Sequence, residues 1–233
     1  MTEQSFADIL EACTDRCQTM DAPLPDRLSA LADDVRRLSP EFAEVVDRMV
    51  NQLQSSAAGQ SAPSPGERMP AFVLPDQDGH LVSLDQLLRN GQVVLAFHRG
   101  HWCPYCRLSA DALARIEPEV KIAGGQIVVI TPEVQKFTRQ LKSDAKATFP
   151  ILSDLDSGHA LELGLAIKIP DEMRSAMTAA GWDISRFMDH DDWTLPIPAT
   201  FVIGTDGCVK ARFVDPDYRK RMDVQDILAA LQA

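Results

Sequence analysis

The chain has 233 residues, of which 45% are hydrophobic and 24% are charged, as is usual for a globular protein with a buried core. The formal net charge of −11 argues against a nucleic-acid partner, because a phosphate backbone attracts a face rich in Lys and Arg. No window approaches the ~18 uninterrupted apolar residues of a membrane span, so we expect no membrane partner either.

Residues 1–57 are predicted to form an N-terminal helical extension. Ser39 is a suitable N-cap and Pro40 a favoured first helical residue. The apolar residues that follow recur at helical spacing and form one stripe: Phe42, Val45, Val46, Met49, Val50 and Leu53. Such a stripe has to be buried, either on the core of the same chain or on a second copy. The second alternative predicts a homodimer through the N-terminal helices.

The same end of the chain bears on its location. The stretch "MTEQSFADILEACTDRCQ" has neither a basic region nor an apolar run, so we expect no secretory signal and a cytoplasmic protein. In a reducing compartment, five cysteines favour catalytic, redox or metal chemistry over a disulfide framework. Cys13 and Cys17 lie one helical turn apart, and we interpret them as small apolar residues of a buried stripe.

A change in pattern divides the chain after the extension. Residues 58–67 are small, polar and rich in Pro and Gly, which predicts a linker. Residues 68–233 then alternate between strand and helix patterns and are predicted to form the main domain. Their first element is a short hairpin around Asp78-Gly79, a dipeptide suited to a tight turn.

Two continuous apolar runs predict strands that are buried on both faces: "QVVLAFH" at 92–98 and "QIVVIT" at 126–131. A helix is expected after each of them. The region 148–195 is irregular, and we interpret its acidic stretch at 187–193 as a solvated loop. A hairpin at 199–214 and a last helix complete an α/β order. This is the element order of the thioredoxin fold, with a central mixed β-sheet flanked by helices.

The stretch "FHRGHWCPYC" contains two cysteines at the point where a buried strand leads into a helix. The positive end of the helix dipole and its unpaired N–H groups stabilise a thiolate. Cys103 is expected to be the exposed attacking cysteine, and Cys106, one turn inside the helix, the more buried partner in a redox disulfide. Arg99 and His101 would add positive potential, and Arg99 would also donate to an oxygen of the substrate.

Two other interpretations of this stretch stay open. A metal site would use Cys103 and Cys106 with His98 or His101, but structural zinc prefers four ligands and no second Cys-x-x-Cys is present. The thiols could also be ordinary core residues. The redox pair is the favoured interpretation, with no metal and no cofactor. Near the C-terminus, "DPDYRKR" is interpreted as a solvated basic cluster rather than part of a substrate entrance.

From Gly66 onward the chain resembles the peroxiredoxin-like proteins of the alkyl hydroperoxide reductase/thiol-specific antioxidant (AhpC/TSA) family. The motifs that carry the resemblance are "PAFVLPDQDGHLVSLDQLL", "VVLAFHRGHWCPYC", "GGQIVVITPE", "FPILSD", "LPIPATFVIGTDG" and "FVDPDYRKR". The resemblance implies a thioredoxin-like fold and a peroxidatic cysteine at Cys103. It also implies that Pro198 is a cis-proline facing the cysteine pair. Gly100 stands where the family carries Thr or Ser. The stretch "WCPYC" is similar to the Trp-Cys-x-x-Cys of thioredoxins, so Trp102 is expected to belong to the site.

These observations predict a thiol-dependent peroxidase of peroxiredoxin type. Cys103 would attack a hydroperoxide and become a sulfenic acid, Cys106 would condense with it, and a thioredoxin- or glutathione-type donor would reduce the disulfide. Because "CPYC" is also the dithiol glutaredoxin motif, a thioredoxin-like protein disulfide oxidoreductase is an alternative. A non-enzymatic redox sensor or interaction protein is another.

Overall fold

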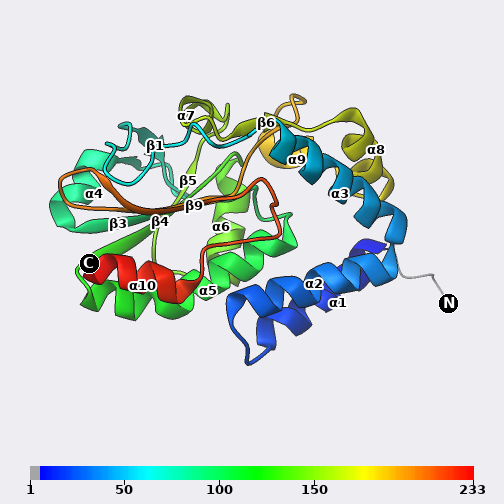
Figure 1. Ribbon diagram of the computed structural model, residues 1–233, viewed down its shortest axis with the longest axis horizontal. Helices are drawn as coiled ribbons and strands as arrows, with labels where there is room; N and C mark the ends of the chain where they lie inside the picture. Colours follow the sequence, from blue (N-terminus) through cyan, green and yellow to red (C-terminus); the bar gives the residue numbers. More distant parts are fainter. Residues whose placement is uncertain (1–5) are drawn as a thin grey trace.

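The computed structural model describes residues 6–233, and its centre is a mixed sheet between layers of helices (Figure 1). Within that range the sheet has five strands in the order β5-β4-β3-β8-β9. Its strands are β3 (Gln92–Phe97), β4 (Gly125–Thr131), β5 (Ile151–Ser153), β8 (Ala199–Ile203) and β9 (Val209–Val214). β3 runs parallel to β4 and antiparallel to β8. The predicted thioredoxin-like α/β fold is confirmed.

Both faces of the sheet are buried at its centre because the strands β3, β4 and β8 are largely apolar. Along β3, Val93, Leu95 and Phe97 belong to one core cluster, while Val94 and Ala96 belong to the opposite one. The helices on the Val94 face are α5 (Pro104–Ile122), α6 (Gln135–Asp144) and α10 (Val224–Gln232). Those on the Val93 face are α4 (Leu84–Asn90) and α7 (Gly158–Glu162). Alternation along an extended strand sends successive side chains to opposite layers.

The turns and caps that the sequence indicated are present. Ser39 Oγ accepts a hydrogen bond from the N–H of Phe42, with Pro40 as the first helical residue. The two turn glycines have positive φ angles, +89° at Gly79 and +82° at Gly207. Residues other than glycine rarely adopt such angles. Their hairpins join β1 (Val73–Pro75) to β2 (Leu81–Ser83) and β8 to β9.

The insertion before β8 is more ordered than its sequence suggests. It contains β6 (Ala166–Lys168), α8 (Asp171–Ala179), α9 (Ser185–Met188) and β7 (Thr194–Pro196), and β6 pairs with β7. The interpretation of 187–193 as a solvated loop is wrong at its ends, because the side chains of Met188 and Trp193 are buried. The acidic residues between them dominated the sequence pattern and concealed these two apolar contacts.

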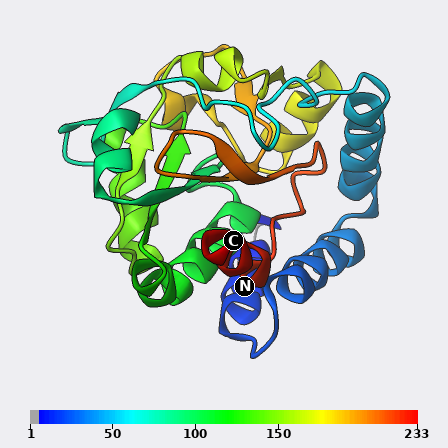
Figure 2. The ribbon, with the colours of Figure 1, turned by 60° about the vertical axis from the view of Figure 1, so that its left-hand side comes forward.

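The N-terminal helices wrap one side of the sheet domain (Figures 1 and 2). They are α1 (Phe6–Thr19), α2 (Leu24–Leu38) and α3 (Pro40–Ser55). Helices α1 and α2 pack on α5, and α3 packs on α8. The apolar stripe that contains Phe42 and Val46 is therefore buried on its own chain, in one cluster with Cys103, Cys106 and Met173. Of the two alternatives for the stripe, the structure shows the first, and the homodimer stays a prediction.

The segment expected to be a linker lies along β9. The Gly66 N–H donates to the Val209 carbonyl over 2.8 Å, and the Arg212 guanidinium donates to the carbonyls of Ala62 and Pro63. The division into an extension, a linker and a main domain stays a prediction. In the part of the chain that the structure covers, no helix combines the length and the apolar character needed to cross a membrane.

Candidate redox site

The two cysteines lie where β3 meets α5, as the sequence predicted. Cys103 is the N-cap residue of α5, Pro104 is its first helical residue, and Cys106 lies in its first turn. All five cysteines are free thiols. The expectation that Cys103 is exposed is wrong, because only 1% of it is accessible and Cys106 is fully covered. The covering residues come from α1–α3 and α8, which are distant in sequence from the motif.

Cys103 lines a cavity of about 30 Å³, which suits a molecule the size of water or hydrogen peroxide. Helices α1, α2 and α3 each contribute one lining residue: Leu10, Val35 and Phe42. Most of the lining is apolar, and Arg99 is its one charged residue among those that the structure describes. A polar ligand in this cavity would therefore meet a thiol and a guanidinium in otherwise apolar surroundings.

Arg99 is held in the cavity wall by two aromatic rings. Its guanidinium carbon lies 4.0 Å from the ring centroid of Tyr218 and 4.9 Å from that of Trp102. Cation–π contacts of this kind fix a buried guanidinium and leave its N–H donors available. The structure thus brings Arg99 and Trp102 together with Cys103, as the sequence predicted, while their roles in binding a substrate remain predictions.

The Cys106 sulfur is the better stabilised thiolate of the pair. It accepts hydrogen bonds from the Arg99 backbone N–H over 3.3 Å and from the Arg221 Nη2 over 3.2 Å. Burial alone would raise the pKa of Cys106, but the hydrogen bond from Cys103, the Arg221 charge and the Arg99 N–H hold it well below its usual value. Burial and the hydrogen bond to Cys106 raise the pKa of Cys103. The two thiols therefore titrate as a coupled pair, and Cys106 is the first of the two to lose its proton.

The interpretation of "DPDYRKR" as a solvated cluster, preferred to one in which Arg219 or Arg221 reaches the substrate entrance, is wrong for Arg221. Arg221 is buried, not solvated, and its Nη1 donates to the carbonyls of Tyr218 and Lys220 over 2.5 and 2.6 Å. The motif "DPDYRKR" carried the signal, but its charges favoured a surface cluster. The fold of residues 215–221 decides the matter, since it turns Arg221 toward Cys106 and Tyr218 toward Arg99.

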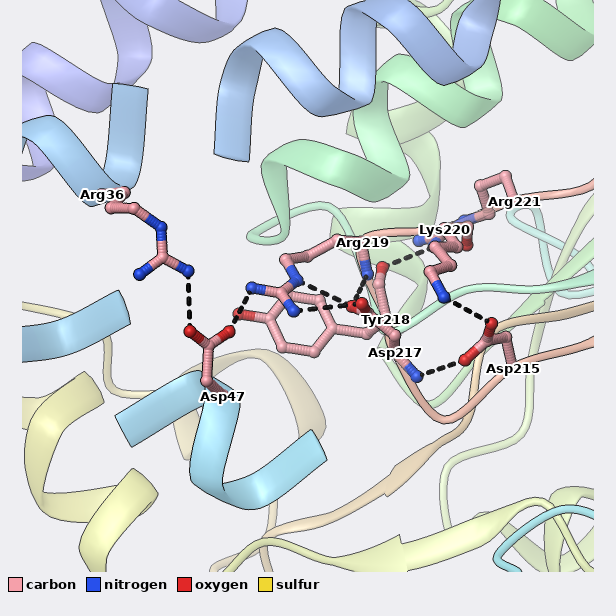
Figure 3. A network of polar contacts seen from close by, with 8 residues as sticks. All are labelled: Arg36, Asp47, Asp215, Asp217, Tyr218, Arg219, Lys220 and Arg221. Atoms are coloured by element: carbon pink, nitrogen blue, oxygen red, sulfur yellow. Dashed lines mark hydrogen bonds and ion pairs between the residues drawn. The ribbon is translucent and has the colours of Figure 1, made fainter. Parts of the chain in front are cut away.

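A network of ion pairs ties this segment to the N-terminal helices (Figure 3). Asp47 on α3 accepts from Arg36 of α2 over 2.7 Å and from Arg219 over 2.8 Å. Arg219 also donates to Asp217 over 2.7 Å. The segment that carries Arg221 is thus anchored to the helices that cover the cavity.

The histidines near the pair face other partners. The His101 Nε2 lies 2.8 Å from Asp144 Oδ2 of α6, and the contribution of His101 to the potential at the cysteines stays a prediction. The His98 Nε2 lies 3.1 Å from Ser109 Oγ, and burial lowers the pKa of His98 to about 4, so its ring is neutral at pH 7. Within residues 6–233, no three His, Cys, Asp or Glu side chains gather as metal ligands.

The prediction of a cis bond before Pro198 is wrong. Every peptide bond in residues 6–233 is trans. Only Ile197 and Pro198 separate β7 from β8, so the chain passes from strand to strand without the tight turn in which cis-proline is usual. Ala199 pairs with Phe97, which places Pro198 at the end of the sheet where β3 leads into the cysteine loop.

The absence of Thr or Ser at position 100 has a steric reason. Gly100 has a φ angle of +133°, and a Cβ at this position would lie 2.5 Å from the Cδ of Glu133. A side chain here would clash with that buried carboxyl group and would strain the backbone. Glu133 follows β4 in the motif "GGQIVVITPE", and nothing in the sequence singled it out.

Comparison with known proteins places the chain in a family. Residues 65–212 match the AhpC/TSA family, and the chain belongs to it. A Mycobacterium tuberculosis protein classed among the peroxiredoxins is 33% identical over 93 residues, which are 40% of this chain and 59% of that protein. Peroxiredoxin Q from rice chloroplasts is 32% identical over 91 residues, 39% of this chain and 42% of the relative. The matches thus span about half of the length of these relatives, 59% of one and 42% of the other.

Solved structures show the same fold. Peroxidoxin BcpB from Mycobacterium tuberculosis has a TM-score of 0.57 at 22% identity and covers 73% of this chain and 97% of its own. Peroxiredoxin 6 of Arenicola marina has a TM-score of 0.55 at 20% identity and covers 72% of this chain and 71% of its own. At these identities the likeness concerns the fold alone.

Proposed function

We propose that the protein is a thiol-dependent peroxidase in which Cys103 attacks a hydroperoxide and Cys106 resolves the product. One observation carries the proposal. The Cys103 thiol lines a small cavity beside Arg99, and the thiolate of Cys106 lies directly behind it. Membership of the AhpC/TSA family supports the same reaction.

The chemistry follows from the coupling of the two thiols. Cys106 takes the proton of Cys103, and the Cys103 thiolate then attacks the nearer peroxide oxygen. The O–O bond breaks, Cys103 becomes a sulfenic acid, and the leaving alkoxide takes up a proton and departs as an alcohol. The Arg99 guanidinium would stabilise the negative charge that develops on the leaving oxygen.

Resolution closes the pair. The Cys106 thiol attacks the sulfenic sulfur, its proton joins the departing hydroxide as water, and a Cys103–Cys106 disulfide forms. An external donor then supplies two electrons and two protons. In sum, two donor thiols and one hydroperoxide give a donor disulfide, an alcohol and water.

The donor is proposed to be a glutathione- or thioredoxin-type thiol. A yeast mitochondrial 1-Cys peroxiredoxin with the same fold is resolved through the glutathione and thioredoxin systems. Because α1–α3 cover the pair, a small thiol needs less opening of the site than a folded reductant does. The same cover argues against protein disulfides as the main substrates. A reducing, cytoplasmic location is part of the proposal, since a Cys-x-x-Cys pair in such a compartment favours redox chemistry over a structural disulfide.

The proposal is tested by the stoichiometry of one turnover. Reduced protein, freed of donor, is mixed with one equivalent of an alkyl hydroperoxide. We expect one equivalent of alcohol, the loss of two thiols, and a Cys103–Cys106 disulfide in the peptide mass spectrum. Oxidation spread over Cys13 and Cys208, or thiol loss without alcohol, would refute the peroxidase assignment.

A further inference from the structure

Glu133 supports the loop that leads into Cys103. It lies two residues beyond β4 and has no exposed surface. Its Oε2 accepts a hydrogen bond from the His101 N–H over 2.7 Å. This amide lies two residues before Cys103. The carboxyl group therefore fixes the backbone that presents the cysteine to the cavity.

No side chain in the described part of the chain neutralises this carboxyl group. The Glu133 Oε1 is buried without a hydrogen-bond partner. Each nearby cation has another partner: the His101 ring faces Asp144 of α6, and the Arg99 guanidinium stacks on aromatic rings. On α6, Lys136 lies over the ring of Phe137. A fully buried carboxylate without a cation is costly, so the proton-bound form is favoured.

One charge does act on Glu133. Burial raises the pKa of Glu133 to about 8, and the negative charge of the Cys106 thiolate contributes to the rise. The same loop connects the two groups, because the Arg99 N–H donates to the Cys106 sulfur and the His101 N–H donates to Glu133. At neutral pH the reduced site thus combines a protonated carboxyl group with the Cys106 thiolate. When Cys106 enters a disulfide, its charge disappears and the carboxylate form of Glu133 becomes less costly. Linkage is reciprocal, so oxidation of the pair promotes release of the Glu133 proton.

We propose that Glu133 is a positioning residue that stores one proton while the Cys103–Cys106 pair is reduced and releases it when the pair is oxidised. This inference rests on the proposed function. It accounts for Gly100, since only glycine leaves room for the carboxyl group against the loop.

The protons of the cycle then balance. The reduced site holds one proton on the pair and one on Glu133. The alkoxide from the broken O–O bond receives the proton that Glu133 gives up, and the proton of the Cys106 thiol leaves in water. A dithiol donor returns two electrons and two protons, of which one restores the pair and the other restores Glu133.

The test is the pH dependence of the redox equilibrium between the full-length protein and dithiothreitol. Reduction of the wild-type pair takes up two protons near neutral pH, as many as dithiothreitol releases, so the equilibrium constant should stay nearly constant with pH. In Glu133→Gln reduction takes up one proton, so the constant should rise about tenfold per pH unit. The glutamine side chain keeps an oxygen that can accept from the His101 N–H. The matched control is Glu119→Gln, because Glu119 is an exposed carboxyl group on α5.

Identical pH dependence in wild type and Glu133→Gln would overturn the inference. If the variant does not fold, the infrared difference spectrum of oxidised minus reduced wild type decides instead. The inference expects loss of a protonated-carboxyl band on oxidation, and an unchanged band contradicts it. A disulfide that forms with hydroperoxide but leaves that band unchanged refutes the role of Glu133 alone. A disulfide that never forms with hydroperoxide refutes the proposed function itself.

Discussion

Cys103→Ser is expected to abolish hydroperoxide turnover, whereas Cys106→Ser is expected to stop after the first step. Serine cannot form the sulfenic acid, and the Cys103 sulfur is the one that lines the cavity. In Cys106→Ser the base that takes the Cys103 proton is also lost. General-base catalysis is worth about 10²–10⁴-fold, so oxidation of Cys103 should slow by a factor in that range. Mass spectrometry should then detect one added oxygen at Cys103 and no disulfide.

Cys208→Ser is the control for both variants. Cys208 lies in the β8–β9 hairpin, outside the core cluster that contains the cysteine pair. We expect wild-type turnover from it. The assignment of attacker and resolver would be reversed if Cys103→Ser gained an oxygen at Cys106 at the wild-type rate. Such a result would assign the attack to Cys106, whose pKa is the lower of the two.

Arg221→Met is expected to slow oxidation of Cys103 about ten- to hundredfold at neutral pH. A hydrogen bond to a charged group contributes about 1.5–3 kcal/mol, and the Arg221 Nη2 donates one to Cys106 over 3.2 Å. Without it the pKa of Cys106 rises, less thiolate is present to take the Cys103 proton, and the rate profile moves to higher pH. Stopped-flow rates across the pH range measure both changes.

Lys220→Met provides the matched comparison for Arg221→Met. Lys220 is the neighbouring cation in the same segment, and it pairs with Asp215 at the surface. We expect the rate and the pH profile of this variant to stay at wild-type values. Arg221→Lys should fall between the two, because it keeps the charge but loses the planar set of donors. If the rate of Cys103 oxidation has the same pH profile in wild type and in Arg221→Met, Arg221 has no role in the reaction.

The sequence predicted the parts of the site that depend on local pattern. The apolar run at 92–98 predicted a strand buried on both faces, and a Cys-x-x-Cys directly after it predicted the helix start at Cys103. Turn and cap residues, such as Ser39 and Gly207, were equally readable because their signals lie within a few residues.

The parts that were missed depend on contacts between distant segments. The burial of Cys103 comes from helices that lie about sixty residues or more away along the chain on either side, and sequence spacing does not say where an apolar stripe docks. Arg221 and Glu133 are charged residues, for which an exposed position is the usual expectation. Their burial follows from the fold of 215–221 and from the glycine at position 100.

The second-order rate constant for oxidation of Cys103 by a hydroperoxide tests the central claim most directly. It is measured by mixing reduced protein with hydroperoxide, quenching with an alkylating agent, and counting the Cys103 thiols that remain. The coupled thiols, the Arg221 charge and the guanidinium in the cavity wall predict a rate constant orders of magnitude above that of a free thiol at the same pH. A rate constant equal to that of a free thiol would contradict the assignment of a peroxidase.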